Sequence, residues 1–288
     1  MKRCVIIDIS KKDNIYLHME RKMKKNAKIW AAIVAIVMIC SMLSGCGMVA
    51  EETVKIEKGE AKIIAHRGLS GLEVENTDAA FIAAGERSYY GIESDVRRTA
   101  DGKFVMCHDA DLERISGQKI DVESSTLEEL KQIPLLNKKG EKDDSIHLTT
   151  LENYISICKE YDKQAILELK SSFTKDEVGS IIDIITALDY LDRVTFISFD
   201  YDNLLYVREY SADQSAMYLF SKMSDETADM LIRDRIDVAI KITKLTKGLI
   251  ERFHEAGLKV NCWTVDSKAL AEIYSEWGVD YITSNILE

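Results

Sequence analysis

Three acidic side chains in this chain could together hold a metal ion. Glu93 and Asp95 lie two residues apart in a predicted strand, and Glu168 lies near the end of another. Side chains two apart on a strand point to the same face. Carboxylates buried side by side are unfavourable unless a cation joins them. This all-oxygen set favours one divalent cation, Ca²⁺ or Mg²⁺, because no Cys/His arrangement nearby indicates zinc.

Two histidines and two basic residues could act on a phosphodiester. His66 and His108 are candidates for proton transfer, because imidazole titrates near neutral pH. Phosphodiester cleavage needs a base for the attacking oxygen and an acid for the leaving alcohol. Arg67 and Lys170 could hold the phosphate oxygens. In the alternative without a metal, the carboxylates form ion pairs with Arg67, Arg97 and Lys170.

These residues need a scaffold that brings the ends of several strands together. Short apolar runs alternate with amphipathic segments, which is typical of parallel βαβ units. Eight such strands favour a closed (β/α)₈ TIM-type barrel over an open doubly wound sheet. The predicted strands cover residues 63–65, 91–97, 165–169, 194–198, 216–219, 238–240, 259–263 and 281–283. The predicted helices cover 77–87, 151–161, 175–189, 202–210, 225–233, 246–256 and 267–276.

Residues 109–148 interrupt this alternation and are predicted to form a small insertion after the second barrel strand. The segment is mostly polar and contains the only proline, Pro134. Before it, Asp101-Gly102 between two apolar runs indicates a hairpin. In such barrels the active site lies at the C-terminal ends of the strands. The candidate residues fall at that end, as does Trp263 at the end of the seventh strand.

The first 45 residues are predicted to be a lipoprotein-type signal peptide. Four lysines precede an apolar run from Ile29 to Met42, which is short for a membrane span. The run leads to Leu43-Ser44-Gly45-Cys46, which resembles a bacterial lipoprotein cleavage box and implies a lipid on Cys46. The alternative is an uncleaved membrane anchor.

The part of the chain after the signal peptide is acidic. Residues 1–45 carry a balance of +6 within a total of −11, which leaves −17 for residues 46–288. This charge argues against nucleic acid as a partner. Residues 46–60 are polar and predict a spacer before a barrel that covers 61–288. We expect an extracytoplasmic barrel held at the cell membrane by its lipid rather than by charge.

Several motifs together resemble the glycerophosphodiester phosphodiesterase family, over about residues 62 to 285. The resemblance implies a TIM-type barrel with an insertion after strand 2 and metal-dependent hydrolysis of a glycerophosphodiester to glycerol 3-phosphate and an alcohol. The motifs that carry it are His66-Arg67-Gly68, Glu75-Asn76-Thr77, Glu93-Ser94-Asp95-Val96, Thr99-Ala100-Asp101-Gly102, His108-Asp109, Glu168-Leu169-Lys170, Trp263-Thr264-Val265 and Gly278-Val279-Asp280.

The resemblance also implies a role for each matching residue. It assigns the metal to Glu93, Asp95 and Glu168, and acid–base catalysis to His66 and His108. It places Arg67 and Lys170 on the phosphate, Trp263 on the pocket wall, and Glu75 near the metal or a substrate hydroxyl.

Other functions remain open from the sequence. The same site could act on lysophospholipids or on polyglycerol phosphates at the membrane surface. A third alternative is a lipoprotein that binds phosphodiesters without cleaving them. The polar character of 109–148 favours a water-soluble diester over a lipid, and the two histidines favour an enzyme over a binding protein.

Overall fold

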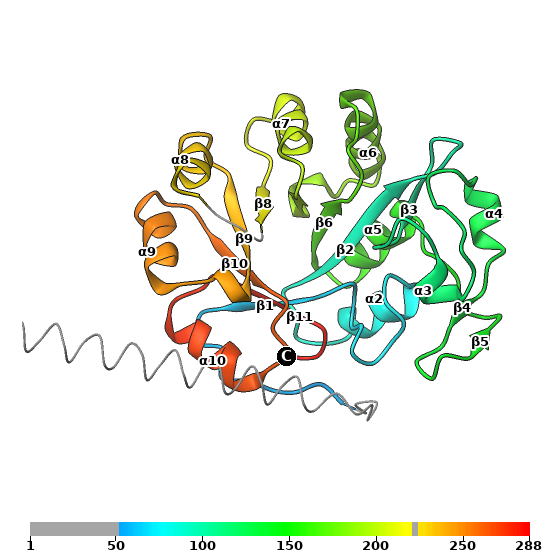
Figure 1. The fold of residues 1–288 in the computed structure, drawn as a ribbon, viewed down its shortest axis with the longest axis horizontal. Coiled ribbons are helices and arrows are strands. Elements are labelled where there is room, and N and C mark those ends of the chain that lie inside the picture. Colours follow the sequence, from blue (N-terminus) through cyan, green and yellow to red (C-terminus); the bar gives the residue numbers. More distant parts are fainter. Residues whose placement is uncertain (1–51, 221–223) are drawn as a thin grey trace, which may run out of the picture. The chain divides into compact units, whose positions relative to one another are not determined.

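The computed structural model describes residues 52–220 and 224–288 (Figure 1). Eight parallel strands close into a barrel, because β1 (Lys62–Ala65) pairs on one side with β2 (Gly91–Arg98) and on the other with β11 (Tyr281–Ser284). The predicted (β/α)₈ barrel is therefore confirmed, and the open sheet is wrong. From β2 the circle continues through β6 (Gln164–Leu169), β7 (Val194–Ser198), β8 (Ala216–Phe220), β9 (Asp237–Lys241) and β10 (Val260–Trp263).

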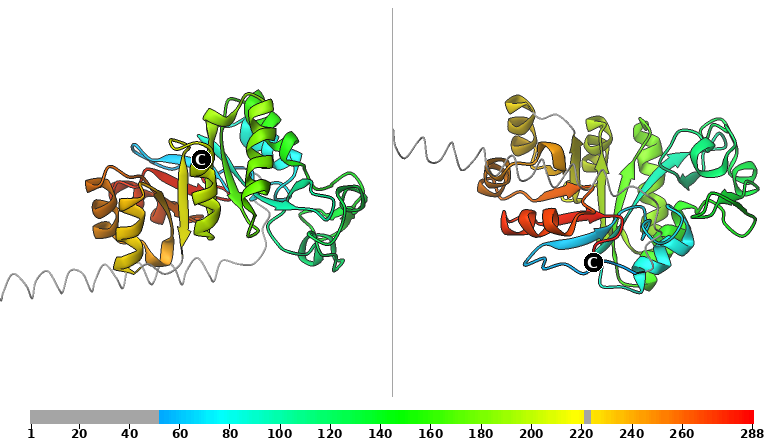
Figure 2. Two further views of the ribbon diagram at one scale, coloured as in Figure 1. Left: turned by 90° about the horizontal axis from the view of Figure 1, so that it is seen from above. Right: turned by 60° about the horizontal axis from the view of Figure 1, so that its bottom comes forward.

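Helices cover the outside of the barrel (Figures 1 and 2). Most are preceded by a Ser, Thr or Asp residue that caps the helix. Its side chain accepts a hydrogen bond from a backbone N–H of the first turn, as Thr77 does for α2. These helices are α2 (Asp78–Gly85), α5 (Leu151–Glu160), α6 (Lys175–Ala187), α7 (Tyr201–Tyr210), α8 (Asp225–Arg233), α9 (Lys247–Glu255) and α10 (Lys268–Glu276). Short 3₁₀ helices lie at η1 (Leu191–Arg193) and η2 (Ile242–Lys244).

The barrel interior is apolar towards its centre and polar at one end. Buried aliphatic side chains from different strands, among them Ile64, Ile166 and Leu219, form one cluster there. The register of β2 and β6 places Asp95 opposite Glu168 and Glu93 opposite Ile166. Strand pairing therefore brings all three predicted metal ligands to neighbouring positions.

A small subdomain is inserted in the chain between β2 and α5, where the sequence predicts an insertion. The strand β3 (Phe104–Met106) returns antiparallel to β2 and leads into this subdomain. Buried residues such as Leu112, Leu130 and Leu135 give it a small core of its own, and it projects from one side of the barrel (Figure 2). Its elements are α3 (Glu113–Ser116), α4 (Leu127–Lys131), β4 (Leu135–Leu136) and β5 (Lys142–Asp143).

The two ends of the described barrel are joined to each other. Val54 and Ile56 donate backbone N–H groups to the carbonyls of Ile286 and Glu288, so the last part of the predicted spacer lies along the C-terminal residues. The Glu288 carboxylate also accepts hydrogen bonds from Thr53 and Ser88. The predicted signal peptide and Cys46 lie outside the described residues. In 52–220 and 224–288, no helix has the length and apolar character needed to span a membrane.

Candidate active site

A cavity of about 150 Å³ opens at the C-terminal ends of the barrel strands. One half is lined by charged and imidazole side chains, and the other by apolar and neutral ones. The charged half holds His66, Arg67, Glu93, His108, Glu168 and Lys170; the other half holds Ile197, Phe199, Leu219, Asn261, Trp263, Thr264 and Thr283. The structure therefore brings seven of the predicted site residues into one cavity, and Asp95 and Glu75 are not among its lining residues.

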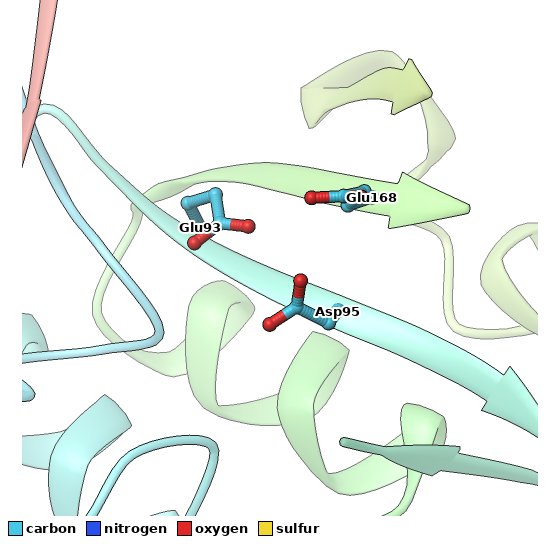
Figure 3. A group of neighbouring side chains, drawn as sticks. All are labelled: Glu93, Asp95 and Glu168. Atoms are coloured by element: carbon cyan, nitrogen blue, oxygen red, sulfur yellow. The ribbon is translucent and has the colours of Figure 1, made fainter. Parts of the chain in front are cut away.

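The three predicted metal ligands face one another across β2 and β6 (Figure 3). One carboxylate oxygen from each lies within 4.8 Å of the others. Glu93, Asp95 and Glu168 are only 3%, 1% and 6% exposed. The cluster is therefore far more buried than acidic groups on a protein surface.

Two cations partly balance these acids. Lys170 Nζ lies 2.9 Å from Glu168 Oε1 and 3.5 Å from Asp95 Oδ1, and Arg67 Nε lies 3.6 Å from Asp95 Oδ2. Burial raises the pKa of Asp95, but Lys170 and Arg67 outweigh it and hold the pKa at about 2. Arg97, the third cation considered from the sequence, pairs with Glu123 instead.

The charged forms of the other two acids, Glu93 and Glu168, are disfavoured. Burial and the nearby Asp95 raise the pKa of Glu168 to about 7, and the same causes raise the pKa of Glu93 well above its usual value. When all three carboxylates are ionised, the two cations leave one negative charge in excess. A hard divalent cation would relieve this repulsion and bind oxygen atoms only, so the donor set fits such an ion.

Neighbouring polar side chains fix Asp95. The Asn76 amide donates to Asp95 Oδ2 at 3.0 Å, and Ser94 Oγ donates to Asn76 Oδ1 at 2.7 Å. Both Asn76 and Ser94 are buried. Ser94 points away from the carboxylate face of β2, and from there it orients the amide so that its NH₂ faces Asp95.

His66 is held by the far end of the chain. Its Nδ1 lies 2.7 Å from Oδ1 of Asn285, whose amide nitrogen donates to Asp266 at 2.6 Å. Because Asp266 fixes the amide, Oδ1 faces His66 and can only accept. The neutral imidazole therefore carries its proton on Nδ1, and Nε2, which lies 3.9 Å from Glu93, keeps its lone pair. Burial, with Arg67, lowers the pKa of His66.

His108 is oriented in the same way by Asp109. Its Nδ1 lies 2.7 Å from Asp109 Oδ1, so Nδ1 donates, and Nε2 makes no hydrogen bond within residues 52–220 and 224–288. Arg97 fixes the backbone by donating to the His108 carbonyl at 2.9 Å. Burial lowers the pKa of His108 more than the nearby Asp95 raises it. Each histidine of the cavity thus has one ring nitrogen anchored and the other available.

The turn after β1 aims Arg67 at the acids. Arg67 adopts a left-handed backbone with φ 56° and donates its N–H to Glu93 Oε2 at 2.9 Å. Gly68 follows with φ 75°, and a Cβ at this position would meet the Ala80 backbone at 2.7 Å, so only glycine fits. The Arg67 side chain also donates to Glu75 at 2.9 Å. Its buried Nε has no hydrogen-bond acceptor among the described residues, which leaves a donor for a ligand oxygen.

Two aromatic rings form the apolar wall. The rings of Phe199 and Trp263 meet edge to face, with centroids 5.6 Å apart. Trp263 Nε1 donates to the Ala239 carbonyl at 2.9 Å and thereby fixes its ring. Phe199 is 45% exposed at the edge of the cavity.

A family model described as the glycerophosphoryl diester phosphodiesterase family matches residues 66–287. The chain belongs to this family. It is 30% identical over 226 residues to a glycerophosphodiester phosphodiesterase of Caldanaerobacter subterraneus subsp. tengcongensis, and the match covers 77% of this chain and 93% of that one.

Solved structures agree with this membership. A phosphodiesterase of Oleispira antarctica, in complex with the product sn-glycerol-3-phosphate, is similar with a TM-score of 0.71 at 25% identity, and the match covers 78% of this chain and 93% of that one. A glycerophosphodiester phosphodiesterase of Parabacteroides distasonis gives a TM-score of 0.65 at 28% identity, with 81% and 94% covered.

Several residues that line or support the site are not predicted from the sequence. Asn285 and Arg114 lie on loops or short helices, where no periodic pattern marks them. Phe199 follows β7 directly, so its position at a strand end was the one signal that could have found it. Glu75 is not part of the cluster of three acids. Its carboxylate accepts hydrogen bonds from Arg67 and Arg114.

Proposed function

We propose that this protein hydrolyses glycerophosphodiesters to glycerol 3-phosphate and an alcohol, with one divalent cation, Ca²⁺ or Mg²⁺. The main support is that two oriented imidazoles, Arg67, Lys170 and two carboxylates of a buried triad line one cavity, and the third carboxylate, Asp95, lies directly beside those two. Membership in the family and the product named for the Oleispira antarctica structure support the same substrate class.

In this proposal Glu93, Asp95 and Glu168 hold the cation, and Arg67 and Lys170 hold the phosphate oxygens. When bound, the cation would lower the pKa of an attacking hydroxyl and offset negative charge that develops on the phosphate. The buried Nε of Arg67 lies 3.6 Å from Asp95 and has no hydrogen-bond acceptor among the described residues, and the planar guanidinium suits a phosphate.

His66 and His108 transfer the protons. One imidazole accepts at Nε2 the proton of the oxygen that bonds to phosphorus, and the other donates a proton to the alcohol oxygen as its P–O bond breaks. The net reaction adds one water across the broken P–O bond. Asn285 and Asp109 support this assignment, because each holds Nδ1 and leaves Nε2 free. Both pKa values lie below the usual value for histidine. This favours the neutral form that the base requires, whereas the acid must take up a proton at Nε2 before it can donate one.

The insertion supports a water-soluble substrate over a lysolipid. Its apolar side chains, such as Leu112 and Leu135, are buried in its own core. Asp109, which contacts His108, and Arg114, which contacts Glu75, are charged. Among the described residues, the apolar side chains that line the cavity are Ile197, Phe199, Leu219 and Trp263, which is a small surface compared with an acyl chain.

A substrate panel tests this function. The purified protein would be assayed for release of sn-glycerol 3-phosphate from glycerophosphocholine, glycerophosphoethanolamine and glycerophosphoglycerol, and for cleavage of lysophosphatidylcholine, with Ca²⁺, Mg²⁺ or chelator. Turnover of the soluble diesters with cation is the expected result. Tight binding without turnover would favour a binding lipoprotein, and preferred cleavage of the lysolipid would favour the membrane-surface alternative.

We also propose that a lipid on Cys46 anchors the barrel outside the cytoplasmic membrane. The support is the sequence Leu43-Ser44-Gly45-Cys46 after a basic and apolar segment. Labelled palmitate should be incorporated into the wild-type protein in cells and not into Cys46→Ala. Equal labelling of both proteins, or recovery of the wild type in the cytoplasmic fraction, would refute the anchor.

A further inference from the structure

Arg114, in the insertion, contacts two carboxylates at the edge of the site. It lies on the short helix α3, and its side chain is 50% exposed. Its Nη1 and Nη2 donate to the two oxygens of Glu75 at 2.8 and 2.7 Å, and its Nε donates to Asp109 Oδ2 at 2.6 Å. All three guanidinium nitrogens are thus engaged.

Each of these carboxylates also holds a residue that faces the cavity. Glu75 Oε1 accepts from Arg67 Nη1 at 2.9 Å, and Asp109 Oδ1 accepts from His108 Nδ1 at 2.7 Å. A continuous chain of hydrogen bonds therefore runs from the phosphate-binding arginine to one of the histidines. It passes through Arg114, which comes from the insertion, whereas Arg67 and Glu75 follow β1.

The geometry requires a guanidinium. Its planar fork can pair with both oxygens of one carboxylate and leave Nε for a second carboxylate, which a lysine ammonium cannot do in a fixed plane. Arg114 also lowers the pKa of Asp109 and of Glu75, in each case against the effect of burial. Both carboxylates therefore remain charged acceptors for His108 and Arg67.

We propose that Arg114 is a positioning residue for catalysis: it clamps Glu75 and Asp109 together and so fixes Arg67 and the tautomer and orientation of His108. The proposal rests on the proposed function, in which those two residues act on the phosphodiester. It gives the insertion a role in assembling the active site.

The first test compares Arg114→Ala with Arg252→Ala. Arg252 is a matched control, because it also joins two carboxylates, Asp225 and Asp229, on α8 away from the cavity. Arg114→Ala should lower kcat/KM for a glycerophosphodiester about 10–100-fold, the range expected for misplaced catalytic groups. Because the side chain is half exposed, added guanidinium should restore part of the activity, whereas equal NaCl should not. Arg252→Ala should stay within about twofold of wild type.

A merely structural role would give a different pattern. The proposal is overturned if Arg114→Ala keeps wild-type kcat/KM, or if its activity falls together with its unfolding temperature and guanidinium restores nothing. Arg114→Lys should remain impaired, because it keeps the charge and loses the fork. Full activity in Arg114→Lys would also contradict the proposed clamp.

A measurement without substrate separates this proposal from the proposed function. Two-bond ¹H–¹⁵N spectra report which ring nitrogen of His108 carries the proton, with His108→Ala used for assignment. The wild type should show a single Nδ1–H tautomer, and Arg114→Ala a mixture. Identical His108 signals in both proteins would overturn the proposal. If the wild type cleaves no glycerophosphodiester, the proposed function fails, and the spectra alone decide whether Arg114 orders His108.

Discussion

His66 Nδ1 and Asn285 Oδ1 lie 2.7 Å apart, although the two residues are 219 positions apart in the sequence. Replacing Asn285 by Ala removes the acceptor that fixes the imidazole. We expect kcat/KM to fall about 10–100-fold through the loss of orientation, with little change in the unfolding temperature. Steady-state kinetics and thermal unfolding of the same preparation would measure both. Unchanged kinetics would show that His66 needs no support from Asn285.

Cation affinity should depend on pH because protons compete for the same carboxylates. The pKa of Glu168 is about 7 and that of Glu93 is raised, whereas Asp95, with a pKa of about 2, stays ionised. Affinity for Ca²⁺ or Mg²⁺ should therefore fall as the pH drops below 7, by about tenfold per unit for each proton displaced. Calorimetric titrations at pH 8 and pH 6 measure this. Equal affinities would contradict the proposed ligand set.

The carboxylate of Glu288 should stabilise the fold without affecting catalysis. It is buried and binds Thr53, Ser88 and Lys55. Burial alone would raise its pKa, but these partners lower it to about 2, from an ordinary value of 4.5. Since the folded-state pKa is depressed, the stabilisation is complete above about pH 4.5 and is lost as the pH falls towards 2.

Glu288→Gln should therefore lower the free energy of unfolding at pH 7 by about 1–3 kcal/mol, and by less at pH 3. Urea unfolding at the two pH values measures the difference, and kcat serves as the control, because Glu288 does not line the cavity. An identical urea midpoint at pH 7 would show that the N- and C-terminal segments are held by their backbone pairing alone.

The barrel is predictable from the sequence because short apolar strands alternate with amphipathic helical segments along the chain. The same alternation of strands and helices builds the barrel. The spacing of Glu93 and Asp95 on one strand places both on one face, and the barrel brings Glu168 beside them. Positions at strand ends, such as His66 and Trp263, follow from the same rule. Element ends shift by a few residues, because capping side chains rather than the apolar pattern decide where helices begin.

Contacts made by loops are not predictable in this way. Asn285 reaches His66 only because closure of the barrel pairs β1 with β11. The position of Arg114 depends on how the insertion folds around its own small core. Neither residue type has a spacing signature, so single-sequence reasoning finds the strand-borne charges of the site and misses the residues that orient them.

Turnover by His66→Ala and His108→Ala tests the proposed acid–base mechanism most directly. His254→Ala is the matched control, because His254 also contacts a carboxylate, Asp280, but lies away from the cavity. With saturating cation, each cavity variant should release sn-glycerol 3-phosphate from a glycerophosphodiester about 10²–10⁴-fold more slowly than wild type, and the control should match wild type. Near-normal turnover in either His66→Ala or His108→Ala would contradict the mechanism.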